Sequence, residues 1–347
     1  MNAPGKLTKP LLEPDVLIFS KTTLPAKVVS SIGRLKGVSA TERISEAQFF
    51  LQEQEVTYAA VNPATFRRWA LVGTAQTDAV WDRVADGEMA IAPKLGRQLQ
   101  DKTDSVKMGG SASAPLVHIG AYAQIFDASN ALGLDAVVNK NWVPKLHMVP
   151  NNGLLIATGA TSPQKIQAQL RKLAGKTASV QILGPNFDIH AVQTTILTGE
   201  SLGSAVGAFN YTANANGTVN PERAWVEANI RTVQVPIIGT VTCNKAMLPQ
   251  LIDVLSEIQQ RGLAKYLDPS QYGGCFVPRY IAGTHQLSYH AFGLAIDLNV
   301  PGNQRGTRGQ MNPQIVDIFR KWGFEWGGTW HYTDPMHFQL DRIVKAG

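Results

Sequence analysis

The segment Ser288-Tyr-His-Ala-Phe-Gly-Leu-Ala-Ile-Asp297 and the later run Asp334-Pro-Met-His337-Phe-Gln decide the fold of the C-terminal part of this chain. Apolar and polar residues alternate from 294 to 300, a pattern that predicts a β-strand with Asp297 facing out of the core. His290 precedes this strand in a turn where Gly293 lets the chain bend, and His337 lies on a second predicted strand, 336–340. Two imidazoles and a carboxylate are therefore expected to meet.

Spacing alone leaves two explanations of these side chains open. Two histidines and one carboxylate leave the fourth position of a zinc ion to water, as in catalytic zinc sites. Alternatively, both histidines are ordinary polar residues near strand ends, and Asp297 pairs with an arginine. A histidine and an aspartate separated by six residues are not a diagnostic ligand pair, so further motifs must decide between the two explanations.

Four ordered motifs together resemble the VanY-type zinc peptidases, which cut bacterial cell-wall peptides. This family comprises D-alanyl-D-alanine carboxypeptidases and dipeptidases and L-alanyl-D-glutamate endopeptidases. The motifs are Pro278-Arg279, Ser288-x-His290-x-x-Gly293-x-Ala295-x-Asp297, Gly323-Phe-Glu-Trp-Gly-Gly-Thr-Trp330 and Asp334-Pro-Met-His337-Phe. The resemblance covers about residues 233–347 and implies a small α+β zinc-peptidase domain with an antiparallel sheet and flanking helices.

The same resemblance implies a role for five residues. A zinc ion would be held by His290, Asp297 and His337, with Asp334 as the general base and Arg279 in contact with the substrate or the developing oxyanion. A zinc-bound water would then hydrolyse an amide bond in a peptidoglycan peptide, in the manner of a D,D-carboxypeptidase or an L,D-endopeptidase. Several carboxypeptidase and dipeptidase members have Glu at the position of Asp334, whereas Asp334 resembles the endopeptidase branch, so the bond that is cut stays open.

Three further residues near these motifs are candidates for the substrate cleft or for support of the metal ligands. Ser288 either holds the turn or donates a hydrogen bond to Asp297. Trp330 either lines the cleft or packs on the core. His331 is expected at the cleft rim rather than on the metal, because three ligands are already assigned.

Helices and strands can be placed on both sides of the middle of the chain. Apolar residues at three- and four-residue spacings predict helices over 248–261 and 312–323 in the peptidase part. In the N-terminal part, strands are predicted at 16–20, 56–61, 154–157 and 180–183, with helices at 26–35 and 163–173. Two segments of this α/β accessory region, Met89-Ala-Ile-Ala-Pro-Lys-Leu-Gly96 and Leu116-Val-His-Ile-Gly-Ala-Tyr122, faintly resemble the periplasmic core domains of FtsX- or MacB-type permeases. The resemblance implies a scaffold or partner-binding role, with a membrane or cell-division protein as the partner.

The chain is long enough for two or three domains. We expect an N-terminal accessory region at 1–203, a linker and strap at 204–232 and the zinc peptidase at 233–347. The stretch 210–221 is rich in Asn, Ala, Gly and Thr and is the best linker candidate. A fragment starting near Ser204 is expected to fold and act alone.

Composition and cysteine content bear on location and partners. The formal charge of +6 and the pI near 9.2 suit an anionic cell wall, and the charges are scattered, so nucleic-acid binding is not expected. Cys243 and Cys275 are expected to form one disulfide in an extracytoplasmic protein of the cell wall, periplasm or medium, although two buried thiols in a cytosolic protein remain the alternative. No signal-peptide pattern is present, so an export or anchor segment is expected to be missing from this sequence.

A rival hypothesis from another functional class is a non-catalytic wall-binding or regulatory protein that retains the peptidase fold. The presence of His290, Asp297, His337 and Asp334 together argues against it, because a protein without the reaction would be free to lose any of them.

Overall fold

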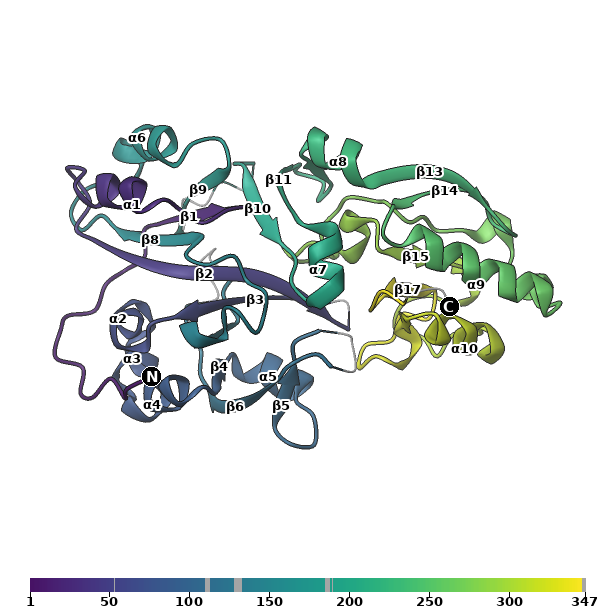
Figure 1. Ribbon diagram of the computed structural model, residues 1–347, viewed down its shortest axis with the longest axis horizontal. Coiled ribbons are helices and arrows are strands. Elements are labelled where there is room, and N and C mark those ends of the chain that lie inside the picture. Colours follow the sequence, from purple (N-terminus) through teal and green to yellow (C-terminus); the bar gives the residue numbers. More distant parts are fainter. Residues whose placement is uncertain (53, 110–112, 128–132, 185–187, 189, 345–347) are drawn as a thin grey trace.

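The computed structural model shows two regions side by side, a large N-terminal sheet with its helices and a smaller C-terminal region (Figure 1). It describes residues 1–52, 54–109, 113–127, 133–184, 188 and 190–344. Sheets and helices are mixed in both regions, and the class is α+β as expected. None of the helices in the described part of the chain has the length and apolar character needed to cross a membrane.

The described strands of the N-terminal region form one nine-stranded sheet in the order β5-β6-β4-β7-β3-β2-β8-β1-β9. The pairs β3–β7 and β4–β6 are parallel, whereas β2 pairs antiparallel with both β3 and β8. The strands are β1 (Val16–Ser20), β2 (Ala40–Leu51), β3 (Gln54–Val61), β4 (Met89–Ile91), β5 (Ser105–Lys107), β6 (Leu116–Tyr122), β7 (Ala136–Asn139), β8 (Gly153–Ala157) and β9 (Ala178–Ile182). All four strands predicted in this region are present.

Helices cover both faces of this sheet because its strands are apolar on both sides. Alternate residues of β1 enter two different cores: Val16 packs with Ile32 and Leu170, and Leu17 packs with Phe66 and Trp81. The helices are α1 (Ala26–Gly33), α2 (Pro63–Phe66), η1 (Arg67–Trp69), α3 (Val72–Gln76), α4 (Asp78–Asp86), α5 (Pro93–Leu99), η2 (Lys140–Trp142) and α6 (Gln164–Ala174). The predicted helices at 26–35 and 163–173 correspond to α1 and α6.

The strand β2 was not predicted, although it is twelve residues long. Its sequence carries Glu42, Arg43, Glu46 and Gln48, which interrupt the apolar pattern. In the structure Glu46 and Gln48 are buried, because β2 lies in the interior of the sheet between β3 and β8. Pairing with distant strands thus overrides the local preference of these polar residues.

The segment between the two regions is folded and packed. The stretch 210–221, predicted as a linker, forms most of a hairpin, because Phe209, Tyr211 and Ala213 alternate as buried residues along one strand. The elements here are β10 (Gln193–Ile196), α7 (Glu200–Val206), β11 (Ala208–Ala213), β12 (Val219–Pro221) and α8 (Arg223–Asn229). Most of their apolar side chains share one core with the C-terminal region, whereas Ile196 of β10 packs in a core of the N-terminal sheet. The boundaries at 203 and 232 remain predictions, since shared packing does not show which part folds alone.

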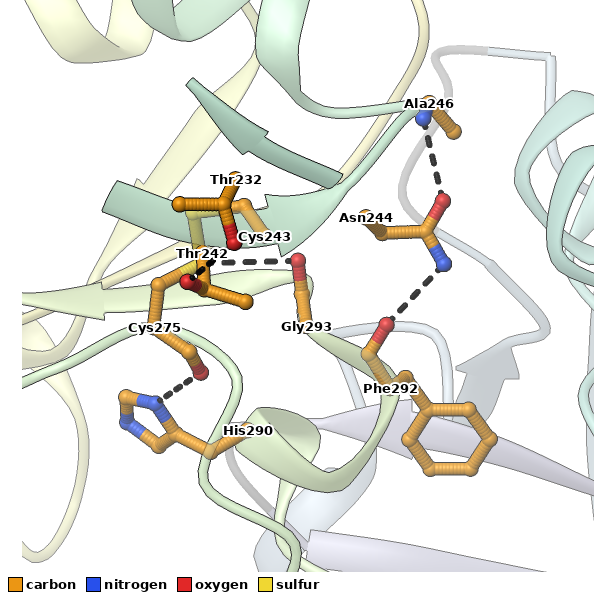
Figure 2. Close-up of a disulfide and its surroundings, with 9 residues drawn as sticks. All are labelled: Thr232, Thr242, Cys243, Asn244, Ala246, Cys275, His290, Phe292 and Gly293. Carbon is orange, nitrogen blue, oxygen red and sulfur yellow. Dashed lines mark hydrogen bonds between the residues drawn. A yellow bond between two sulfur atoms is a disulfide. The ribbon is translucent and has the colours of Figure 1, made fainter. Parts of the chain in front are cut away.

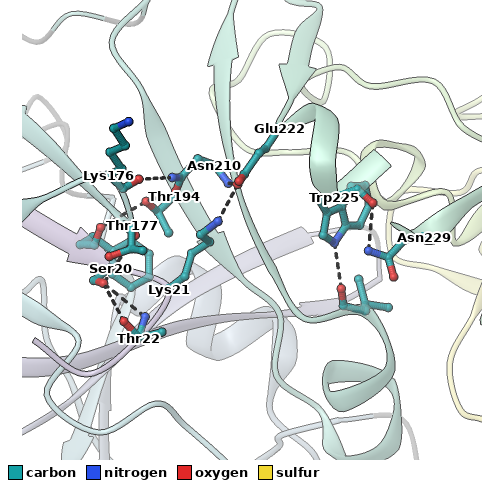
Figure 3. Close-up of polar contacts among 12 residues, drawn as sticks. Ser20, Lys21, Thr22, Lys176, Thr177, Thr194, Asn210, Glu222, Trp225 and Asn229 are labelled. Atoms are coloured by element: carbon teal, nitrogen blue, oxygen red, sulfur yellow. Dashed lines mark hydrogen bonds and ion pairs between the residues drawn. The ribbon is translucent and has the colours of Figure 1, made fainter. Parts of the chain in front are cut away.

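Polar contacts also tie this middle segment to the N-terminal sheet (Figure 3). Lys21, just after β1, forms an ion pair with Glu222 at 2.6 Å between Nζ and Oε2. The amide N–H of Asn210 donates to the same carboxylate at 3.3 Å. The hydroxyl of Thr194 in β10 donates to the Asn210 side chain at 2.8 Å and lies 3.2 Å from the main-chain carbonyl oxygen of Phe19 in β1. In the middle segment itself, the Trp225 indole donates to the main-chain carbonyl of Val206 at 2.9 Å.

The C-terminal region is a small antiparallel sheet beside two helices. The strand order is β15-β17-β16, next to the hairpin β13–β14. Its elements are β13 (Ile230–Val235), β14 (Gly239–Asn244), α9 (Leu248–Gln260), η4 (Ala264–Tyr266), η5 (Pro269–Gln271), η6 (Tyr289–Phe292), β15 (Ala295–Asp297), η7 (Val300–Gly302), α10 (Pro313–Lys321), β16 (Phe324–Trp326), η8 (Gly327–Thr329) and β17 (His337–Leu340). Both predicted helices are confirmed: α9 is followed by the left-handed Gly262, and α10 begins after an Asn312 cap.

Candidate metal centre

His290, Asp297 and His337 converge at one end of the small sheet. Antiparallel pairing of β15 with β17 puts Asp297 directly opposite His337, and His290 comes from the adjacent turn η6. The Nε2 atom of His290 lies 3.2 Å from Nδ1 of His337 and 3.3 Å from Oδ2 of Asp297. Nδ1 of His337 lies 3.2 Å from Oδ1 of Asp297. All three side chains are buried, so the register of two short strands builds a compact donor cluster.

These distances suit a tetrahedral metal ion. With ligand atoms about 2.0–2.1 Å from a zinc ion, two ligands of a tetrahedron lie about 3.3–3.4 Å apart. Each pair of side chains approaches within 3.2–3.3 Å, with Oδ2 of Asp297 toward His290 and Oδ1 toward His337, and one ligand atom from each residue lies within 4.8 Å of the others. Two nitrogens and one carboxylate are also a donor set that zinc prefers.

Hydrogen bonds on the outer side of each imidazole orient its inner nitrogen toward the centre of the cluster. Nδ1 of His290 lies 2.9 Å from the carbonyl oxygen of Cys275, which can only accept, so Nδ1 carries the proton (Figure 2). Nε2 of His337 lies 3.3 Å from Oε1 of Gln339, whose amide in turn donates to Glu325 at 3.0 Å. When the imidazoles are neutral, their inner lone pairs and the carboxylate converge on one point, which a cation would stabilise.

The carboxylate of Asp297 is held in its ionised form. Burial alone would raise the pKa of Asp297, but attraction to His290 and hydrogen bonds from His290 and His337 lower it well below its ordinary value. The group is thus an anionic ligand throughout the neutral range.

The turn that carries His290 is fixed by several main-chain contacts. Ser288 is fully buried, and its hydroxyl oxygen accepts the N–H of His290 at 3.3 Å. Gly293 has a φ of 66° and passes so close to β14 that a Cβ atom would lie 2.8 Å from the Asn244 nitrogen. The side chain of Asn244 donates to the carbonyl of Phe292 at 3.0 Å (Figure 2). These contacts leave His290 little freedom to move.

The predicted disulfide is present and lies beside the cluster. Cys243 at the end of β14 is bonded to Cys275, with 5.4 Å between their Cα atoms (Figure 2). Cys275 supplies the carbonyl oxygen that orients His290. The crosslink therefore anchors a chain segment that sets the position of a candidate ligand.

Asp334 lies on the turn that leads into β17. Its side chain is 4% exposed, and its main-chain oxygen accepts the N–H of His337 at 3.1 Å. Gly327 makes room for this turn, since a Cβ atom there would lie 2.4 Å from the Asp334 carbonyl oxygen. Nε of Arg305 is 4.0 Å from the Asp334 carboxylate, so a cation also lies near the candidate base.

The other predicted site residues lie around the cluster. Arg279 is half-buried, and its guanidinium makes no hydrogen bond or ion pair with the residues that the structure describes; its carbonyl accepts the N–H of Ser288 at 3.0 Å. Trp330 is 5% exposed, and its ring centroid lies 5.2 Å from that of His337. His331 is exposed and lies outside the donor cluster.

Sequence reasoning missed Gln339, Glu325 and Arg305. The first two had a readable signal. Gln339 lies two residues after His337 on one strand, so both side chains face the same way, and Glu325 is the cross-strand partner of Gln339. Arg305 had none, because it lies in an irregular loop whose path only the structure shows.

Comparison with known families agrees with this geometry. Residues 282–340 match the D-alanyl-D-alanine carboxypeptidase family model. The matched segment contains the three candidate ligands and Asp334, whereas Arg279 lies just before it. The resemblance to this peptidase family seen in the sequence is thus supported for the segment that carries the cluster.

Comparisons over the rest of the chain identify no family. No curated protein matches the sequence. Among solved structures, a domain described as belonging to a permease protein of Porphyromonas gingivalis aligns with a TM-score of 0.26 and 14% identity, over 50% of this chain and 89% of that chain. A likeness at this level bears on neither activity nor partner.

Proposed function

We propose that the protein is a zinc-dependent peptidase that hydrolyses amide bonds in cell-wall peptides, as a D,D-carboxypeptidase or an L,D-endopeptidase. The observation that carries the proposal is the buried triangle of the His290, Asp297 and His337 side chains, each pair of which approaches within 3.2–3.3 Å, so that together they can surround one cation. This triangle lies inside the segment that matches the peptidase family model.

The three residues would hold the zinc ion and leave one position open. A zinc ion bound there would lower the pKa of a water molecule to about 7 and so supply a nucleophile at neutral pH. Asp297 contributes the negative charge that favours a divalent cation, and the outer hydrogen bonds keep both imidazoles in the required tautomer.

Asp334 is the proposed general base. Its turn is tied to His337 by a main-chain hydrogen bond of 3.1 Å, which keeps the carboxylate next to the ligand strand. In this role Asp334 takes a proton from the attacking water and passes it to the leaving amine. Trp330 covers His337, and this apolar ring excludes water from one side of the cluster.

Arg279 is the proposed contact to the substrate. Its planar guanidinium suits a carboxylate or a developing oxyanion. The backbone around it is fixed to the His290 segment, because Ser288 donates to the Arg279 carbonyl and Val277 donates to the His290 carbonyl at 3.1 Å. A half-buried arginine without a described side-chain partner is available for a ligand.

An extracytoplasmic location follows from this proposal. Cell-wall peptides are found outside the cytoplasmic membrane, and the disulfide between Cys243 and Cys275 is of the kind that persists in oxidising compartments.

The test is digestion of purified peptidoglycan by the full chain, with the soluble products weighed by mass spectrometry. We expect release of D-alanine or of shortened stem peptides, loss of this release after chelation and its return after addition of zinc. The His337→Ala variant is the matched negative control. Wall binding without any cleaved bond, with zinc bound at the site, would favour the non-catalytic rival.

A further inference from the structure

One hairpin of the N-terminal sheet reaches the turn that carries His290. Strands β2 and β3 run from the middle of the large sheet toward α7 and the C-terminal region (Figure 1). Directly after β2, Oε1 of Gln52 lies 3.5 Å from the main-chain nitrogen of His331. Residues far apart in the sequence thus meet beside the candidate metal centre.

Glu55, the second residue of β3, binds two consecutive residues of the peptidase part. Its carboxylate accepts the main-chain N–H of Leu287 at 2.7 Å. Its main-chain oxygen accepts the side-chain amide of Gln286 at 2.8 Å. Glu55 is 8% exposed and Leu287 is fully buried. A buried N–H group without an acceptor is costly, so this carboxylate has a defined role in holding Leu287.

Phe50 of β2 holds the same turn from a second side. Its ring centroid lies 4.7 Å from that of Tyr289 and 5.5 Å from that of Phe292. These two aromatic residues flank His290 in η6. The N-terminal hairpin therefore contacts the turn both before and after the candidate ligand.

The surroundings of Glu55 are not those of a structural ion pair. No lysine, arginine or histidine among the described residues pairs with it, and burial, with Asp135 nearby, raises the pKa of its carboxyl to about 8. Tyr211 and Tyr280 also face it. A carboxyl kept in such an unfavourable environment, with the Leu287 N–H as a partner across the regions, points to a function of that contact.

We propose that Glu55 is a positioning residue of the metal site: it fixes the Leu287 N–H, and through it the turn that presents His290. The N-terminal region is then a working part of the peptidase and not a detachable accessory. This inference rests on the proposed function, because it concerns the proposed metal site, but it is tested by metal binding and not by hydrolysis.

The test compares Co²⁺ binding and the visible absorption of the bound ion in the full chain and its variants. Glu55→Met keeps the size and removes the acceptor; we expect an affinity for Co²⁺ about tenfold lower and a changed spectrum. Glu55→Gln keeps an acceptor oxygen and should restore both. Glu46→Met is the matched control, because Glu46 is also buried in β2 but its main chain is bonded to Asn152 within the N-terminal region.

A folded Glu55→Met variant with wild-type affinity and spectrum would overturn the inference. If that variant does not fold, Gln286→Ala removes the second contact from the peptidase side and should weaken Co²⁺ binding about threefold; unchanged binding would then overturn it. A wild-type chain that binds Co²⁺ but cleaves no wall peptide would refute the proposed function while leaving this inference in place. A chain that binds no metal would refute both.

Discussion

The buried carboxylates of the N-terminal sheet and the carboxylate of Asp297 in the C-terminal region have pKa values that are shifted in opposite directions. In the N-terminal sheet, burial raises the pKa of Glu46 and Glu55 to about 8 and that of Asp135 to about 7. Burial acts in the same direction on Asp297, but His290 and His337 hold its pKa well below the ordinary value. Burial alone thus raises the pKa of a carboxyl group and favours its neutral form, whereas two converging imidazoles lower the pKa and favour an anionic ligand.

The two regions also differ in how they use their strands. The N-terminal sheet is wide and covered on both faces, and it supplies rigidity and the hairpin that carries Glu55. The C-terminal sheet has three short strands, yet its register brings Asp297 and His337 together. Among the described residues, the only cluster of three metal-ligating side chains lies in the C-terminal sheet. The larger sheet thus belongs to the N-terminal region, whereas the candidate metal ligands belong to the C-terminal region.

The largest expected effect is loss of the metal. His290→Ala or His337→Ala removes one of three converging donors, so each variant should lose stoichiometric zinc, measured by elemental analysis of the purified protein. His285→Ala and His331→Ala are matched controls, since both histidines are exposed and outside the cluster. Full zinc content in both ligand variants would show that the metal is not held by His290 and His337 in the C-terminal region.

A smaller effect is expected from the proposed base. Asp334→Asn keeps the shape of the side chain but cannot accept the proton of the attacking water, so turnover of wall peptides should fall by roughly 10² to 10⁴. Bound zinc should stay unchanged, because Asp334 is outside the ligand set. Asp317→Asn, at an exposed position of α10, is the control. Near wild-type turnover by Asp334→Asn would remove the assigned role.

Much of the candidate site could be predicted because its signals are local. The turn motif around His290 and the short separation of Asp334 from His337 are properties of neighbouring residues. Both predicted helices of this region also have a signal at one end, Gly262 after α9 and Asn312 before α10. The disulfide was predictable because the chain has two cysteines.

The rest depends on contacts between distant residues. Glu55 and Leu287 are 232 positions apart, and no periodicity in the sequence connects them. Strand β2 escaped prediction because its buried Glu46 and Gln48 look like solvent-facing residues until the neighbouring strands are known. The hairpin at 210–221 was predicted as a linker from its composition, which says little about the alternation of Phe209 and Tyr211.

Removal of the disulfide is expected to lower the stability of the C-terminal region more than that of the N-terminal sheet. Replacing Cys243 and Cys275 by alanine opens a loop with a sequence separation of 32, and the chain-entropy model assigns such a loop about 3 to 4 kcal/mol. We expect the C-terminal region to unfold at lower urea concentration, while the unfolding of the N-terminal sheet is little changed. Zinc affinity should drop as well, because the Cys275 carbonyl orients His290. Equal destabilisation of both regions would show that they unfold as one unit.

Over a single pH unit, the smallest effect is expected from the pH dependence of the buried N-terminal acids. The pKa of Glu46 is raised by burial from 4.5 to about 8, so the folded state binds more protons than the unfolded state between these two values. Stability should therefore fall as the pH rises from about 4.5 to about 8, by on the order of 1 kcal/mol per pH unit for such a group, and level off above that range. Asp297 acts in the opposite sense, since its depressed pKa contributes stability above the ordinary pKa that is lost in acid.

Glu46→Gln isolates the N-terminal contribution, because a neutral amide takes the place of a neutral carboxyl. Urea unfolding at pH 6 and pH 7 should show a pH slope about 1 kcal/mol per unit shallower in the variant than in the wild type. Glu227→Gln, a change at an exposed carboxylate of α8, should leave the slope as it is. A slope unchanged by Glu46→Gln would mean that Glu46 is ionised in the folded protein, and the contrast between neutral N-terminal acids and an anionic C-terminal ligand would then not hold.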